Sequence, residues 1–186
     1  MSLSGVSDFS SYAFSKDETK ILLATEVESI FRRSTLGIYY VYDVFSKKTV
    51  RISDKKIQEP TLSPDGSKVA YVLNNNLYIF DLKSQITEQI TTDGEKNKII
   101  NGVTDWVYEE EFSIVRTYEW SPDGAKIAFL RFDESQVPEF SMEIYDHALY
   151  PQADTFKYPK AGENNSVVTL HLVDVNTKKI NEVDVG

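Results

Sequence analysis

Three consecutive glutamates, Glu109, Glu110 and Glu111, are the residues of this sequence with the clearest capacity for chemistry. Carboxylates held close together repel one another, and a cation with several N–H donors, such as a protonated amino terminus, satisfies them best. Trp106 and Phe112 flank the run, which indicates that part of it lies against a surface. The sequence therefore predicts a carboxylate site for an ammonium group. A solvated acidic turn is the alternative.

Other kinds of catalytic site have little support in the sequence. The chain has no cysteine, which excludes thiol nucleophiles, disulfides and Cys-ligated zinc. Its two histidines, His147 and His171, lack metal-ligand spacing and a serine partner, and no Gly-x-Ser-x-Gly nucleophile motif occurs. We therefore expect no catalytic residue, no metal and no cofactor in this chain.

The charge balance and the hydropathy pattern limit the partners. Twenty basic and 29 acidic residues give a net charge of −9, which opposes binding to a phosphate backbone, so no nucleic acid is expected. No apolar run reaches the ~18 residues of a membrane span. Residues 1–10 lack the basic and apolar regions of a signal peptide, so we expect no targeting segment in this chain.

A repeated turn organises the chain. Residues 62–71 and 120–129 each contain Ser-Pro-Asp-Gly, in which Pro, Asp and Gly suit successive turn positions between two strands. Residues 14–23 keep the same frame but lack the Pro and the Gly. Short runs rich in β-branched and aromatic residues surround each copy, and no amphipathic helix is evident. The pattern predicts an all-β chain.

The repeat predicts four strands per unit and about twelve strands in all. The units are roughly 8–51, 52–95 and 96–186, and the last contains insertions at 105–112 and about 134–165. Repeats of this kind are typical of a β-propeller, whose ring needs at least ~4 blades. We therefore predict a partial β-propeller of about three four-stranded antiparallel blades, part of a larger N-terminal domain.

The run from Asp105 to Phe112, Asp-Trp-Val-Tyr-Glu-Glu-Glu-Phe, resembles the signature of dipeptidyl peptidase IV, in the prolyl oligopeptidase group of serine peptidases. Further matching motifs follow in the family's order: Trp120-Ser-Pro-Asp-Gly, Phe132-Asp-Glu, Val137-Pro and Tyr158-Pro-Lys-Ala-Gly. The resemblance implies an eight-bladed N-terminal propeller followed by an α/β-hydrolase catalytic domain, which is absent from this chain.

The resemblance also implies residue roles. Glu110 and Glu111 match the two glutamates that anchor the free α-amino group of a peptide substrate, so that Xaa-Pro or Xaa-Ala dipeptides are released. Glu109 matches a glutamate not usually assigned to substrate. A propeller arginine that contacts a substrate carbonyl falls at Arg32, next to Arg33, although a surface basic pair is the alternative reading.

The resemblance further implies partners and a location. The 145–163 segment has several aromatic residues, which suits an exposed ribbon in a protein contact. In the family this region resembles an arm that contributes to homodimerisation. The other implied partners are a peptide with a free amino terminus and the hydrolase domain of the same protein. The location implied is periplasmic, extracellular or at the cell surface.

Two alternatives remain open at this point. A noncatalytic propeller that binds peptides or proteins would have the same repeats, since a fold does not fix a function. A sibling peptidase with a different chain-end specificity is the other. Absence of a downstream hydrolase domain, or of its serine, would support the noncatalytic propeller. Assays with tripeptide and blocked substrates would distinguish the sibling peptidase from a dipeptidyl peptidase.

Overall fold

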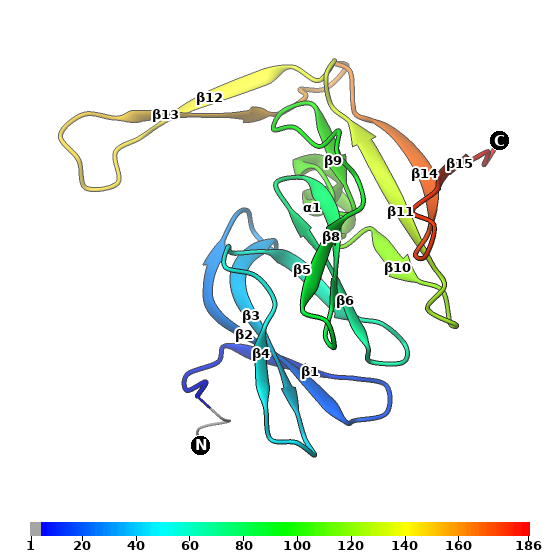
Figure 1. Ribbon diagram of the computed structural model, residues 1–186. Coiled ribbons are helices and arrows are strands. Elements are labelled where there is room, and N and C mark those ends of the chain that lie inside the picture. The colour runs from blue at the N-terminus through cyan, green and yellow to red at the C-terminus, as the bar shows by residue number, and fades with distance from the viewer. Residues whose placement is uncertain (1–4) are drawn as a thin grey trace.

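Two antiparallel four-stranded sheets and then a five-stranded one follow one another along the chain in the computed structural model, which describes residues 5–186 (Figure 1). The first sheet has the strands β1 (Ser11–Phe14), β2 (Lys20–Ser29), β3 (Thr35–Asp43) and β4 (Thr49–Arg51) in that spatial order. The second has β5 (Gln58–Leu62), β6 (Lys68–Leu73), β7 (Asn76–Asp81) and β8 (Ile86–Gln89). The predicted all-β partial β-propeller is confirmed.

The third sheet contains both insertions. Its order is β10 (Tyr118–Trp120), β11 (Lys126–Asp133), β14 (Val167–Asp174) and β15 (Ile180–Val183), and β9 (Ile99–Asn101) also pairs with β11. The first insertion forms the helix α1 (Trp106–Phe112). The second forms a separate ribbon, β12 (Glu139–Ile144) and β13 (Gln152–Lys157), here called the arm, which extends away from the sheets in Figure 1.

The sheets pack face to face through apolar side chains, as blades do. Tyr71 and Phe80 of the second sheet pack with Val41 of the first in one core cluster. Val72 and Ile79 of the same sheet belong to a second cluster, which is shared with the third sheet. Alternate residues of a strand point to opposite faces, so the middle sheet is buried on both sides.

A buried polar junction fixes the third sheet against the second. The Tyr118 hydroxyl donates to the carbonyl oxygen of Ala70 over 2.8 Å and accepts from the Thr61 hydroxyl at 3.1 Å. The Trp120 indole N–H donates to the same Thr61 hydroxyl at 3.1 Å. Burial raises the pKa of Tyr118, so its phenol stays neutral and can serve as a donor.

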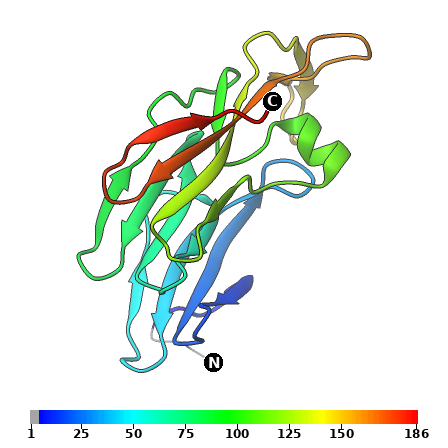
Figure 2. The ribbon, with the colours of Figure 1, turned by 90° about the vertical axis from the view of Figure 1, so that its right-hand side faces the viewer.

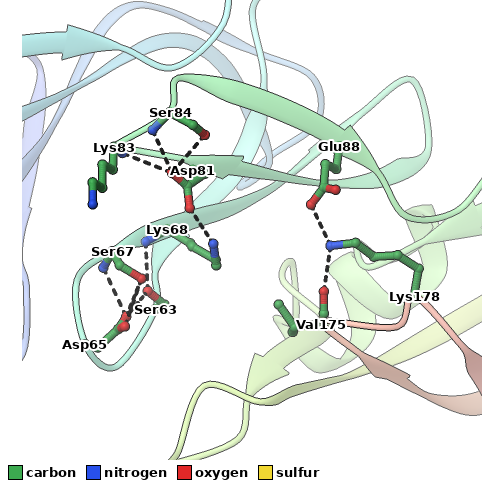
Figure 3. A network of polar contacts seen from close by, with 10 residues as sticks. All are labelled: Ser63, Asp65, Ser67, Lys68, Asp81, Lys83, Ser84, Glu88, Val175 and Lys178. Atoms are coloured by element: carbon green, nitrogen blue, oxygen red, sulfur yellow. Dashed lines mark hydrogen bonds and ion pairs between the residues drawn. The ribbon is translucent and has the colours of Figure 1, made fainter.

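The predicted turn repeat is confirmed in its hydrogen bonds. In the second copy the Ser63 hydroxyl donates to Asp65 and accepts from the Lys68 backbone N–H, and Lys68 forms an ion pair with Asp81 (Figure 3). The first and third copies repeat the bond from lysine N–H to serine hydroxyl, each at 2.9 Å. Figure 3 also shows Lys178 of the third sheet bonded to Glu88 of the second. Polar side chains at this end thus shape the hairpins, and a separate ion pair joins the second and third sheets.

Helix α1 corrects the expectation that the chain has no helix. Seven residues are too few to show amphipathic periodicity over several turns, which is why the pattern did not reveal it. Figure 2 shows α1 at the end of the sheets away from the Ser-Pro-Asp-Gly turns, beside the loop between β2 and β3. This end, with residues 30–34, α1 and the base of the arm, is called the site end below.

Candidate functional site

Helix α1 begins at a buried aspartate and ends at a left-handed serine. The Asp105 carboxylate accepts a hydrogen bond from the Tyr108 backbone N–H at 3.0 Å, which is the geometry of an N-cap. Its second oxygen accepts from the Ser166 hydroxyl, just before β14. Ser113 ends the helix with φ 57° and donates its N–H to the Glu109 carbonyl oxygen. The helix is therefore fixed at both ends and tied to the third sheet.

The three glutamates do not share one environment, because successive residues of an α-helix point about 100° apart. Glu109 is 1% exposed and faces the protein. The Glu110 side chain is 17% exposed. Glu111 is exposed. The helix thus turns one glutamate inward and places the next two progressively toward solvent.

Glu109 joins α1 to the loop that connects β2 and β3. Its Oε1 atom accepts two backbone N–H groups, from Arg33 at 2.6 Å and from Ser34 at 3.0 Å. Within the loop, Ile30 N–H donates to the Ser34 carbonyl oxygen at 2.9 Å. The Phe31 N–H donates to the Ser34 hydroxyl at 3.3 Å. Most backbone donors of this short loop are therefore satisfied.

The predicted arginine lies beside one of the two predicted glutamates. Arg32 Nε stands 3.2 Å from Glu110 Oε1. The Arg32 side chain is 70% exposed, so the guanidinium keeps most of its donors toward solvent. Glu111 has no polar partner within residues 5–186. The structure thus brings Arg32 and Glu110 together and leaves the Glu111 side chain exposed.

Aromatic residues hold the base of the arm against α1 and the loop. The Trp106 and Tyr158 ring centroids are 4.6 Å apart, and Phe31 and Phe156 lie 6.5 Å apart. Phe156 and Tyr158 were expected on an exposed ribbon, but both are half-buried. Five exposed apolar residues of the arm lie farther out: Met142, Ile144, Tyr145, Leu149 and Tyr150.

A cavity of about 290 Å³ lies on the inner side of α1. Trp106, Glu109 and Glu134 are among its lining residues, whereas Glu110 and Glu111 are not. Burial, with a smaller contribution from the nearby Asp105 charge, raises the pKa of Glu134 to about 7. The cavity therefore lies on the side of α1 that carries Glu109, and it is separate from the two glutamates predicted to bind an ammonium group.

The two histidines lie far from this arrangement. His147 is exposed at the tip of the arm. His171 stacks on Phe129 in the third sheet, and partial burial lowers its pKa. Within residues 5–186, no three Asp, Glu or His side chains form a group that could hold a metal ion. No helix of the same residues is long and apolar enough to cross a membrane.

Stacked four-stranded sheets with an acidic helix at one end define a β-propeller segment with a polar site. A family model described as the dipeptidyl peptidase IV (DPP IV) N-terminal region matches residues 15–186. The chain belongs to this family. The resemblance read from Asp105–Phe112 and the later motifs is thereby confirmed.

Relatives and solved structures agree with this assignment. The chain is 36% identical to human prolyl endopeptidase FAP over 168 residues, covering 89% of the chain and 22% of that protein. It is 36% identical to a protein of Neurospora crassa named "Probable dipeptidyl-aminopeptidase B", covering 92% of the chain and 20% of that protein. The crystal structure of Porphyromonas gingivalis dipeptidyl peptidase 4 matches with TM-score 0.93 and 44% identity, over 97% of the chain and 26% of that structure. The chain thus spans about a fifth to a quarter of these proteins.

Sequence reasoning missed the contact of Glu109 with the 30–34 loop and the different directions of the three glutamate side chains. It treated the run as adjacent carboxylates in one pocket, whereas the helix separates their directions. One signal was available: Asp105 stands three residues before Tyr108 and Glu109 follows, and an acidic N-cap with a glutamate in the first turn is typical of a helix start.

Proposed function

We propose that this chain is the substrate-recognition segment of a DPP IV-like serine exopeptidase that releases N-terminal Xaa-Pro or Xaa-Ala dipeptides. Glu110 and Glu111 hold the α-amino group of the peptide, and Arg32 contacts a substrate carbonyl. The Ser, Asp and His of catalysis belong to a hydrolase domain of the same protein. The relatives named above, each several times longer than the chain, support such a further domain.

The ion pair between Arg32 and Glu110 is the observation that carries this proposal. An arginine beside a carboxylate orients it through a charge-assisted contact. Glu111, open on the same outer part of α1, can accept further N–H donors of an ammonium group. A charge clamp at a fixed distance from the nucleophile acts as a ruler, because a longer N-terminal extension would leave the clamp empty or clash with it.

The test uses the full-length protein and the double variant Glu110→Gln/Glu111→Gln. Removing one side of a close charge pair costs about 2–5 kcal/mol, so kcat/KM for an Xaa-Pro substrate should fall at least about 30-fold. Glu18→Gln, an exposed glutamate in the turn between β1 and β2, is the matched control and should leave kcat/KM unchanged. Turnover close to the parent value in a folded double variant would refute the clamp.

Two alternatives have distinct outcomes. A noncatalytic propeller would bind peptides without cleaving them, and an active-site serine probe would not label the full-length protein. One relative is named an endopeptidase and another an aminopeptidase, so chain-end specificity also needs a direct test. Preference for free over N-acetylated Xaa-Pro substrates supports the exopeptidase, whereas equal turnover supports the sibling peptidase.

We also propose that a second copy of the protein docks on the arm. Leu149 is 93% exposed and Tyr150 82%, and large apolar residues at this exposure are typical of contact surfaces. Both strands of the arm are edge strands, whose free backbone groups favour pairing with another chain. Light scattering should show a dimer that Met142→Asp/Leu149→Asp converts to a monomer. The periplasmic, extracellular or cell-surface location remains part of the proposal, and cell fractionation tests it.

A further inference from the structure

We infer that Glu109 is a positioning residue: its buried carboxylate fixes the 30–34 loop to α1 and so sets where Arg32 stands relative to Glu110 and Glu111. This inference rests on the clamp proposed above and assigns a role to the glutamate that the clamp leaves unused. It concerns a residue that does not touch the substrate.

The first observation is the burial and bonding of Glu109. The residue is 1% exposed, and its Oε1 atom accepts two successive backbone N–H groups, those of Arg33 and Ser34. A buried carboxylate is costly unless hydrogen bonds satisfy it, and bonds to a charged acceptor are stronger than neutral ones. The contact is therefore a strong and specific link between segments 75 residues apart in the sequence.

The second observation is how little else restrains Arg32. Its side chain is 70% exposed, so packing does not define the position of the guanidinium. Arg33 donates through its backbone, and its own side chain is exposed. Within residues 5–186, the polar contacts between the loop and α1 are the two bonds to Glu109 and the Arg32–Glu110 ion pair. An ion pair with one largely exposed partner contributes little by itself, so we infer that the backbone link sets the geometry.

The third observation is that one short helix presents all three carboxylates. Glu109 points inward and binds the loop backbone, while Glu110 points outward and meets the arginine of the same loop. The inner contact therefore determines the distance of the outer one. A displacement of about 1 Å in a positioning group can lower turnover about 100-fold.

Two variants of Glu109 distinguish the hydrogen-bond acceptor of the side chain from its charge. Glu109→Gln retains an Oε1 atom that can accept both N–H groups, whereas Glu109→Leu has similar size and no acceptor. In the full-length protein, Glu109→Leu should lower kcat/KM for a free Xaa-Pro substrate about 10- to 100-fold. Glu109→Gln should restore most of this loss. An equal loss in both variants would overturn the inference.

A double-mutant cycle tests whether Glu109 acts through Arg32. With Arg32→Met in place, Glu109→Leu should cause little further loss, because the group that it positions is gone. Independent, additive losses would show that Glu109 supports only the general fold and would overturn the inference. A merely structural role would lower turnover equally with and without Arg32.

A spectroscopic test works on the chain itself and does not depend on activity. Because the sequence lacks cysteine, Arg33→Cys/Phe112→Cys provides two exposed sites for spin labels, and the Arg33 backbone donor is retained. The interspin distance distribution should be narrow in this background and with Glu109→Gln, and broad or shifted with Glu109→Leu. An unchanged distribution with Glu109→Leu in a folded chain would refute the link. Failure of the clamp would appear only in the Glu110→Gln/Glu111→Gln assay, so the two failures are distinguishable.

Discussion

The turn end and the site end of the sheets are built in different ways, although both rest on carboxylates that accept N–H and O–H groups. At the turn end, each aspartate bonds to residues two or three positions away, and the pattern recurs in all three sheets. At the site end, Asp105 reaches Ser166 and Glu109 reaches Arg33, across 61 and 76 positions. Local contacts define the blades, whereas long-range contacts define the site.

The largest difference in stability is expected between alanine variants of two aspartates that accept similar hydrogen bonds. Asp105 is 5% exposed and caps α1, while Asp65 is exposed in its turn. Asp105→Ala should lower the free energy of unfolding by about 2 kcal/mol, because it removes an N-cap and leaves two partly buried donors without their acceptor. Asp65→Ala should cost only about 0.5–1 kcal/mol, because water replaces the lost acceptor.

Denaturant unfolding of both variants at pH 5 makes this comparison. At that pH Glu134 is protonated, so relief of its repulsion with Asp105 does not enter the result. Asp105→Asn is the matched control, since asparagine is an equally good N-cap. Equal losses for Asp105→Ala and Asp65→Ala would show that the site end is no more dependent on its buried contacts than the turns are.

The next prediction concerns the pH dependence of the site end. Burial moves the pKa of Glu134 from its ordinary value of 4.5 to about 7, opposed by Lys157 and assisted by Asp105 and Asp133. Between these pH values the folded chain holds a proton that the unfolded chain has lost. The contribution of Glu134 to stability is therefore complete below about pH 4.5, declines as the pH rises to about 7, and is flat above it.

Glu134→Gln removes this decline, since the amide is neutral at every pH. The variant should be more stable than the parent at pH 8 by about 1–2 kcal/mol, with little difference at pH 5. Unfolding curves at both pH values give the measurement. Asp133→Asn is the control, and its effect on stability should have the opposite sign, because hydrogen bonds from Ser135 lower the pKa of the half-exposed Asp133. A Glu134→Gln chain with the parent's pH dependence would contradict the prediction.

The contrast between local contacts at the turn end and long-range contacts at the site end also explains which features the sequence could predict. Ser63, Asp65 and Gly66 lie within four positions of one another, so turn chemistry alone indicated the hairpins and, by repetition, the sheets. Arg32 and Glu110 were placed in one site only through the family resemblance. Nothing in the local sequence indicates that Glu109 binds a loop 75 residues away, because that contact depends on how the first and third sheets stack.

The smallest predicted effect on stability concerns the turn of the first copy, which lacks the Pro and the Gly of the other two. Gly66 and Gly124 occupy the left-handed region with φ of 66° and 69°, and Glu18 takes the same position in the first copy with φ 58°. A side chain in this conformation costs about 1–2 kcal/mol, which Glu18→Gly should relieve. Greater freedom in the unfolded chain offsets part of the gain, so we expect about 0.5 kcal/mol of stabilisation.

Gly66→Ala provides the converse measurement. A Cβ at Gly66 would meet Lys20 atoms at 3.7 Å, an ordinary contact, so the expected loss of about 1 kcal/mol comes from the backbone alone. Opposite signs for Glu18→Gly and Gly66→Ala would show that one turn geometry is imposed on all three hairpins, whatever their sequence. A loss of stability in both variants would mean instead that Glu18 makes its turn in a way that glycine cannot reproduce.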